Sequence, residues 1–238
     1  MSTGHQHPLT LMIAEINDIF ADIGYTFATG PEMESAYFNF DRLNFPPEHP
    51  ARDMQDTFWL RSEDVTEATV LRTHTSPVQA RYMDAHKPPL RIISPGKVFR
   101  NEATDATHEA QFYQFEGLCV DQGIHMGHLK GVIEYFFSKF FTGETKVRFR
   151  PSFFPFVEPG VEVDMMILDG ETPLVGKWLE VMGAGMVHPN VLRDSGIDPE
   201  QYTGFAFGIG IDRLAVIRYG IPDIRESYSG DLRFVNQF

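Results

Sequence analysis

Arginine and carboxylate side chains follow one another along two short apolar runs near the middle of the sequence. Arg100 and Glu102 close the first run. Gln114 and Glu116 lie in the second run, beyond a polar stretch that ends near His108. Because side-chain direction alternates along a strand, an antiparallel pair would place the polar side chains of both runs on one face. That face is either a binding surface for a polar substrate or a solvated surface crossed by ion pairs, and this segment favours neither interpretation.

A second segment, residues 208–213, leads from a strand-like run into a helix predicted over residues 214–219. Gly208 and Gly210 would let a ligand approach the backbone closely, and Arg213 lies near the start of the helix, where anions are favoured. Arg213 occupies the third glycine position of a dinucleotide fingerprint, and no βαβ unit surrounds the segment, so we reject that fold. The segment fits a phosphate-bearing ligand or a tight turn in which Arg213 pairs with an acid.

Two further segments contain polar or charged residues that a purely structural role can explain. Ser76 precedes Pro77, a pattern that predicts a helix N-cap at Ser76. Residues 153–159 join aromatic side chains to Glu158 between two prolines, which argues against an ordinary central strand. We interpret that segment as a rigid aromatic wall.

Neither a zinc site nor a nucleophilic cysteine is predicted. His125 and His128 lie three residues apart, yet no further Cys or His completes a tetrahedral set nearby. Cys119 lies in a predicted strand without an activating neighbour, so we expect a small buried apolar residue.

The elements that position these residues predict an α+β fold. Apolar residues recur at helical spacing over residues 8–24 and 129–141; the first run ends at Gly24 and the second is followed two residues later by Gly143. Short β-branched and aromatic runs predict strands at residues 91–93, 98–100, 112–120, 147–149, 161–168, 178–182 and 205–209. Helices do not alternate regularly with strands, which favours a mostly antiparallel sheet with helices against it. Residues 45–52 and 187–199 are predicted loops inside one domain.

Composition limits the function classes. The chain has 238 residues, with a hydrophobic share of 42% and a net charge of −13, which suits one globular domain over residues 1–238 and argues against a broad cationic surface for nucleic acid. One cysteine and no signal peptide point to a reducing compartment, the cytoplasm. No apolar run approaches the roughly 20 residues of a membrane helix.

Taken in order, these segments resemble the signature motifs of class II aminoacyl-tRNA synthetases, and most closely the catalytic module of bacterial phenylalanyl-tRNA synthetase α subunits. Motif 1, a dimer interface in the family, corresponds to residues 30–32, motif 2 to residues 99–117 and motif 3 to residues 208–213. Family-specific stretches also match at residues 39–41, 49–52, 71–76, 154–159, 185–189 and 218–223. The resemblance spans nearly the whole chain and implies the class II catalytic fold, an antiparallel sheet flanked by helices.

Two features depart from the family pattern. Family α subunits begin with a long helical arm that helps to hold tRNA, whereas this sequence starts at the catalytic module near His7 and Pro8. The resemblance therefore implies activation of the amino acid more directly than charging of tRNA. Asp212 stands where the family usually has Glu, and we expect it to shorten one supporting contact.

The resemblance implies a phenylalanine–tRNA ligase that joins phenylalanine to AMP and then to tRNA. In that reaction Arg100 would clamp the α-phosphate and the substrate carboxylate, and His108 and Arg213 would hold the outer phosphates. Glu102 would meet the adenine amino group. Phe112 would stack on the base, with Arg213 on its other face.

The implied phenylalanine site has a polar and an apolar end. At the polar end Ser76, Gln114 and Glu116 would bind the ammonium group, with His74 nearby. The apolar end consists of Phe154 and Phe156 along the ring, with Val157 and Ala206 at the far end.

The resemblance also implies a cofactor and partners. Mg²⁺ would accompany ATP, with Glu158 as the first expected ligand and Glu180 as the second. A β subunit would join the chain in an assembly of two α and two β chains, with an α–α contact through motif 1. tRNA(Phe) would be held mostly by the β subunit and by regions absent from this chain.

Two other interpretations compete with an enzyme. A related module could bind amino acid or nucleotide for regulation or assembly without charging tRNA, but such modules typically lose the phosphate-binding residues that Arg100, His108 and Arg213 represent. A purely structural subunit does not explain why polar residues cluster in strand positions beside glycines.

Overall fold

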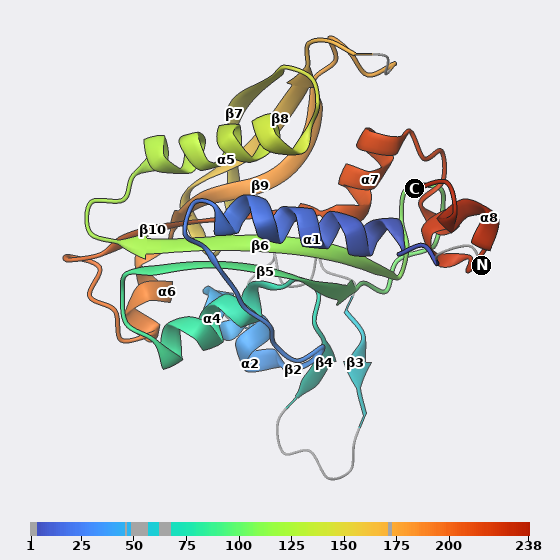
Figure 1. Cartoon of the computed structure of the whole chain (residues 1–238). Helices are drawn as coiled ribbons and strands as arrows, with labels where there is room; N and C mark the ends of the chain where they lie inside the picture. Colours follow the sequence, from blue (N-terminus) through green and yellow to red (C-terminus); the bar gives the residue numbers. More distant parts are fainter. Residues whose placement is uncertain (1–3, 46, 49–56, 62–67, 171–172) are drawn as a thin grey trace.

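The computed structural model describes residues 4–45, 47–48, 57–61, 68–170 and 173–238 of the chain. A long central sheet has helices on both faces, and a small second sheet lies beside it (Figure 1). None of the helices in these ranges has the length and apolar character needed to cross a bilayer. The stretch 49–52, one of the family-specific matches, lies outside the described residues, as does most of the predicted loop 45–52.

The central sheet is antiparallel except at one edge. Its strand order is β1-β5-β6-β10-β9-β8-β7, and β1 pairs with β5 in parallel. The strands are β1 (Thr26–Phe27), β5 (Leu90–Phe99), β6 (Gln111–Asp121), β7 (Thr145–Phe154), β8 (Val157–Ile167), β9 (Leu179–Val187) and β10 (Thr203–Gly210). Together with the flanking helices this arrangement confirms the predicted α+β class.

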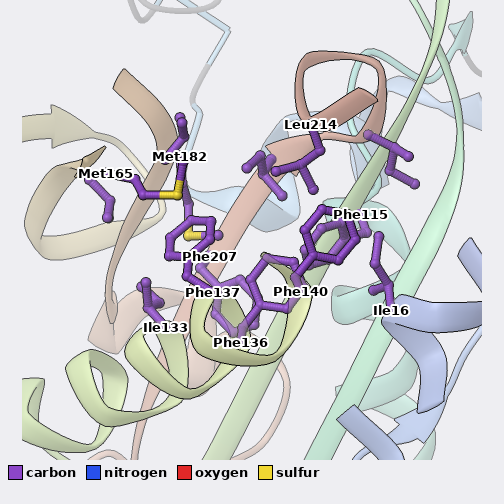
Figure 2. Close-up of a cluster of buried hydrophobic side chains, with 14 of the residues drawn as sticks. Ile16, Phe115, Ile133, Phe136, Phe137, Phe140, Met165, Met182, Phe207 and Leu214 are labelled. Carbon is purple, nitrogen blue, oxygen red and sulfur yellow. The ribbon is translucent and has the colours of Figure 1, made fainter. Parts of the chain in front are cut away.

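Helices α1, α5 and α7 cover one face of the sheet and bury the main apolar core. Their bounds are α1 (Pro8–Ala21), α5 (Met126–Phe140) and α7 (Ile211–Tyr219). The centre of the Phe20 ring lies 5.3 Å from the centre of the Phe136 ring and 5.6 Å from the centre of the Phe207 ring. Figure 2 shows Phe136 and Phe207 gathered with Phe115 in this cluster. Contacts of this kind add about 0.5–1.5 kcal/mol per ring pair to the burial of the rings.

One glycine of β6 makes room for this core. A Cβ atom at Gly117 would lie 2.1 Å from Cζ of Phe207, far inside van der Waals contact. The far end of the Phe207 ring therefore fills the space that a side chain at position 117 would need, and only glycine fits there.

The opposite face of the sheet carries the shorter elements. They are α2 (Ala36–Asn39), α4 (Ser76–Ala85), α6 (Pro189–Asp194), the 3-10 turn η1 (Asp41–Leu43) and a sheet of β2 (Met33–Ser35), β4 (Thr69–Leu71) and β3 (Trp59–Leu60). Buried Arg72 ties this layer to the main sheet, because its Nε donates to the carbonyl of Lys97 at 2.7 Å and its Nη1 to that of Gly30 at 3.0 Å. A Cβ at Gly96 would lie 2.2 Å from this guanidinium.

The C-terminal elements return to the start of the chain. They are η2 (Ile224–Tyr228) and α8 (Leu232–Val235), and Figure 1 places both chain ends at the same end of the molecule. The ring of His7 caps α1 through Nδ1, which accepts from the N–H of Leu9, and donates through Nε2 to the carbonyl of Ser227 at 2.8 Å.

Most predicted elements are confirmed, with corrections at their boundaries. The predicted strands 91–93 and 98–100 are one strand that ends at Phe99, because Pro95 and Gly96 stay in register with Phe115 and Gln114 of β6. The predicted loop 187–199 was wrong, because Pro189 begins the short helix α6 there.

Two interpretations of polar and aromatic segments also change. Thr75, not Ser76, is the N-cap of α4, and the hydroxyl of Ser76 is used elsewhere. Residues 153–159 form the tight hairpin between β7 and β8, and Pro159 lies inside β8 next to a bulge, a position that strands tolerate for proline.

Candidate functional site

A cavity of about 550 Å³, here called the central cavity, opens on the sheet face that carries α4. Strands β6, β9 and β10 form its floor, and the hairpin between β7 and β8 and the start of α4 form its walls. Ten of the residues predicted from the sequence line it: His74, Ser76, Arg100, Phe112, Gln114, Glu116, Phe154, Phe156, Glu180 and Ala206. Segments far apart in the sequence therefore meet in one place.

A row of paired positions across the sheet explains the shape of the floor. Glu116 of β6 is paired with Gly208 of β10, Gly208 with Gly183 of β9, and Gly183 with Glu162 of β8. A Cβ at Gly208 would lie 2.9 Å from Cγ of Glu116, and one at Gly183 would lie 3.0 Å from Cζ of Phe154. The two glycines thus leave an open floor between a carboxylate at each end.

Glu116 is the most strongly perturbed acid of the cavity. Its carboxylate accepts hydrogen bonds from Ser76 Oγ at 2.6 Å, Gln79 Nε2 at 2.7 Å and the backbone N–H of Thr75 at 3.1 Å. Burial raises the pKa of Glu116 to about 7, and these hydrogen bonds oppose the shift only in part. The carboxyl group of Glu116 therefore changes between its neutral and its charged form close to neutral pH.

Several buried polar atoms of the central cavity have no hydrogen-bond partner among the described residues. They are both ring nitrogens of His74, Nε of Arg100 and Oε1 of Gln114. Buried polar groups in folded proteins are nearly always satisfied, so this cluster indicates a place that a polar ligand completes. Burial, and next the charge of Arg100, lower the pKa of His74 to about 3, so its ring is neutral.

Arg100 and Phe112 lie together beside this cluster. The guanidinium carbon of Arg100 is 5.0 Å from the centre of the Phe112 ring, a cation–π geometry. Burial lowers the pKa of Arg100, but an arginine stays charged under any ordinary condition. A buried cation with a free Nε is well placed for an anionic ligand group.

The other end of the cavity is an aromatic wall. Phe154 and Phe156 stack with ring centres 5.9 Å apart, and Phe45 lies 5.7 Å from Phe156. Ala206 lines the floor beside this wall, whereas Val157 is buried beneath Gly185 and does not line the cavity.

Three of the predicted nucleotide-binding residues lie outside the lining. Glu102 is half-buried in the segment after β5. His108 is exposed and its Nδ1 lies 3.0 Å from Oδ1 of Asp105. Arg213 is exposed on the first turn of α7, which begins at Gly210 on the edge of the cavity.

Sequence reasoning missed several lining residues, of which Gln79, Phe45 and Glu162 are examples. Gln79 lies three positions after Ser76 on the same face of α4, a spacing that could have signalled it. Phe45 and Glu162 gave no such local signal, because only the fold brings them to the cavity.

Comparison with known proteins decides the family. The whole chain, residues 1–238, matches the family described as "tRNA synthetases class II core domain (F)". The phenylalanine–tRNA ligase alpha subunit of Caldanaerobacter subterraneus subsp. tengcongensis is 55% identical over 240 residues, which cover 99% of this chain and 69% of that protein. The chain belongs to the phenylalanine–tRNA ligase alpha subunits.

Two further comparisons agree with this assignment. The phenylalanine–tRNA ligase alpha subunit of Bacillus subtilis is 52% identical, over 100% of this chain and 70% of that protein. Among solved structures, the pyrrolysyl-tRNA synthetase of Desulfitobacterium hafniense superposes with a TM-score of 0.70 over 95% of this chain and 75% of that one. At 18% identity this second likeness concerns the fold alone.

Asp212 stands where phenylalanine–tRNA ligase alpha subunits usually have Glu, and we expect the shorter side chain to shorten one supporting contact. Buried Asp212 accepts from the backbone N–H of Tyr113 and from the hydroxyl of Tyr228, both at 2.6 Å. It therefore joins the start of α7 to β6 and to η2. Burial raises the pKa of Asp212, and the two hydrogen bonds oppose that shift.

The carboxylates expected to hold Mg²⁺ fit that ion by donor type. The side chain of Glu158 is 75% exposed, its Oε2 lies 3.3 Å from Nε2 of His188, and it does not line the cavity. Glu180 lines the cavity and pairs with Arg150 at 2.9 Å, and Arg150 also pairs with Glu162 at 2.8 Å. No group of three or more metal-ligating side chains occurs in the part of the chain that the structure describes. Mg²⁺ usually takes only one or two carboxylates together with waters and substrate phosphates, so such a group is not required.

Proposed function

We propose that this chain is the adenylate-forming subunit of a phenylalanine–tRNA ligase. It activates phenylalanine with ATP to phenylalanyl-adenylate and pyrophosphate, and transfers the phenylalanyl group to tRNA(Phe) together with a β subunit. The observation that carries this proposal is the central cavity, in which unpaired buried polar atoms meet an aromatic wall over a floor of glycines.

The amino acid lies along the floor with its ammonium group at Glu116. The carboxylate of Glu116, Oε1 of Gln114 and the hydroxyl of Ser76 supply acceptors for the three ammonium protons. His74 is neutral and does not repel the ammonium group. The phenyl ring then reaches Phe154 and Phe156, where edge or stacked contacts favour an aromatic side chain over an aliphatic one.

The substrate carboxylate and ATP meet at Arg100. Attack of the carboxylate on the α-phosphate needs positioning and charge neutralisation more than a protein nucleophile. Arg100 supplies a buried cation for both anionic groups, and Phe112 supplies a face for the adenine. Glu102, His108 and Arg213 would contact the adenine and the outer phosphates from the rim of the cavity.

Glu180, which lines the cavity, would hold Mg²⁺. Glu158, the other expected ligand, lies outside the lining near the Val187 end of β9, whereas Glu180 is paired with Asp164 of β8, so the two carboxylates would not hold one ion together. When bound, the ion neutralises phosphate charge and orients the leaving pyrophosphate. Arg150 of β7 reaches across β8 to pair with Glu180, and its charge would have to be shared once a cation binds.

Partners follow from the family and from exposed apolar groups. Met33, Trp59 and Tyr37 are 61%, 51% and 46% exposed around the small sheet, close to the motif 1 residues 30–32. Such a patch supports an α–α contact there. The β subunit, tRNA(Phe) and a cytoplasmic location are part of the same proposal.

The test is amino-acid-dependent exchange of pyrophosphate into ATP, measured with phenylalanine and with tyrosine, with and without an added β subunit. We expect exchange with phenylalanine and little with tyrosine. Arg100→Gln should abolish it, whereas Arg193→Gln, on the exposed end of α6, should not. Absence of exchange even with the β subunit would favour a binding module that does not activate amino acids.

A further inference from the structure

A second cavity, here called the helix-side pocket, opens on the opposite face of the sheet and encloses about 400 Å³. It lies between the turn after α1, the first half of α5 and the strands β5, β6 and β10. The register places the two cavities back to back: Cys119 pairs with Phe205, and both line the helix-side pocket. The next pair, Leu118 with Ala206, lines the central cavity.

The walls of the helix-side pocket are apolar, and one buried hydroxyl among them has a thiol as its polar neighbour. Ile23, Ile124, Val132 and Phe205 contribute to the walls. Tyr25 is only 7% exposed and lines the pocket, and its hydroxyl lies beside the thiol of Cys119 without a hydrogen bond of ordinary geometry in the described part of the chain. Because a thiol is a weak hydrogen-bond partner, this hydroxyl can donate to a stronger acceptor that a ligand brings.

The remaining polar groups of the pocket are also donors. Nδ1 of His128 accepts from the backbone N–H of His125 at 3.2 Å, so the neutral ring carries its proton on Nε2. Arg91 lies at the edge, half-exposed, with Nη2 3.5 Å from Oδ2 of Asp121, a long and weak ion pair. No aspartate or glutamate of the described residues lines the pocket.

Tyr25 and Cys119 stay uncharged, and Tyr135 adds a further hydroxyl to the lining. Burial raises the pKa of Tyr25 and that of Cys119, so the phenol and the thiol keep their protons at neutral pH. The pocket therefore offers a phenol hydroxyl, an imidazole N–H and a guanidinium, with no negative group along its lining to oppose an anion.

We propose that the helix-side pocket binds a small monocarboxylate with an apolar body, whose carboxylate accepts hydrogen bonds from Tyr25 and Arg91. The apolar body would fill the space between α5 and the sheet, and the carboxylate would replace the weak contact that Arg91 makes with Asp121. This site is separate from the central cavity, and its occupancy does not require that the chain activate an amino acid.

The test is saturation-transfer NMR on the wild-type chain with sodium octanoate, and with 1-octanol as the neutral analogue. We expect octanoate to bind at least about tenfold more tightly than 1-octanol, because a charge-assisted hydrogen bond is lost in the alcohol. Tyr25→Phe should weaken octanoate binding about fivefold and Arg91→Gln about tenfold. The matched controls Tyr82→Phe and Arg193→Gln, on the opposite face of the sheet, should bind as the wild type does.

A blocking variant gives an independent readout. A Cβ at Gly131 of α5, which lines the pocket, meets no atom within 4 Å. Gly131→Leu should therefore fold, since leucine favours a helix more than glycine does, and should abolish octanoate binding. The proposal is overturned if wild-type chain with native melting shows no transfer to octanoate. It is equally overturned if binding survives the three pocket variants and is lost in Arg100→Gln, which would assign octanoate to the central cavity.

Discussion

Glu116 should make the free energy of unfolding fall as the pH rises, opposite to the trend of most carboxylates. Burial raises the pKa of Glu116 from its ordinary value of 4.5 to about 7. Between these two values the folded protein keeps a proton that the unfolded chain releases. The stability that this group contributes is therefore fully present below pH 4.5 and is lost as the pH rises through 7.

The size of the effect follows from the same two pKa values. A difference of about 2.5 pH units corresponds to about 3 kcal/mol, of which about 2.5 kcal/mol falls between pH 5 and pH 8. Glu116→Gln is neutral at every pH and removes this loss. The free energy of unfolding of the variant should therefore rise relative to the wild type by about 2.5 kcal/mol from pH 5 to pH 8.

The assay is urea denaturation followed by circular dichroism at pH 5, 6, 7 and 8. Glu134→Gln, on the exposed face of α5, serves as the matched control and should follow the wild type at every pH. Parallel pH curves for Glu116→Gln and the wild type would refute the reasoning, because they would mean that Glu116 ionises in the folded protein as it does in the unfolded chain.

Three further variants test the core and the central cavity. Gly117→Ala should lower the free energy of unfolding by about 2–3 kcal/mol, measured by urea denaturation, because the new methyl group overlaps the ring of Phe207. Ala206→Gly should raise pyrophosphate exchange with para-chlorophenylalanine about tenfold relative to phenylalanine, because it enlarges the cavity beside the aromatic wall. Arg100→Gln should lower exchange with phenylalanine at least about a hundredfold with an unchanged melting temperature, since its charge faces the cavity and not the core.

Each of these has a control or a contradicting result. Gly131→Ala, where a Cβ meets open space, should not destabilise the protein. An unchanged preference between the two amino acids would remove Ala206 from the substrate pocket. Normal exchange by Arg100→Gln would contradict the role proposed for the buried cation.

The spacing of apolar residues in the sequence was sufficient to predict the helices and strands that bury a continuous apolar face. Helices α1 and α5 were predicted because their apolar residues repeat at helical spacing, and β6 and β10 because theirs are β-branched or aromatic. The short helix α6 was missed, since proline and asparagine at its start also favour loops. The N-cap of α4 was misplaced because a serine before a proline satisfies the capping pattern, although the hydroxyl of Ser76 binds Glu116 instead.

The candidate site was predictable where its residues share one segment, and not where only the fold unites them. Arg100 directly follows β5, and Gln114 and Glu116 lie in the adjacent strand β6, so alternation alone predicted that they share one face. Phe45 and Glu162 reach the cavity from segments more than a hundred residues apart, which no local pattern reveals. The depth of Glu116 in the protein, and therefore its raised pKa, also depends on packing from α4 that the sequence does not specify.

The floor of paired glycines sets a direction for protein engineering. Gly208 and Gly183 already carry the smallest side chain, so any exchange there can only narrow the room for a ligand. Directed-evolution libraries aimed at bulkier amino acids should therefore leave these two positions unchanged and randomise the wall, at Phe154, Phe156 and Ala206. Exchanges at the glycines should instead be used to exclude substrates.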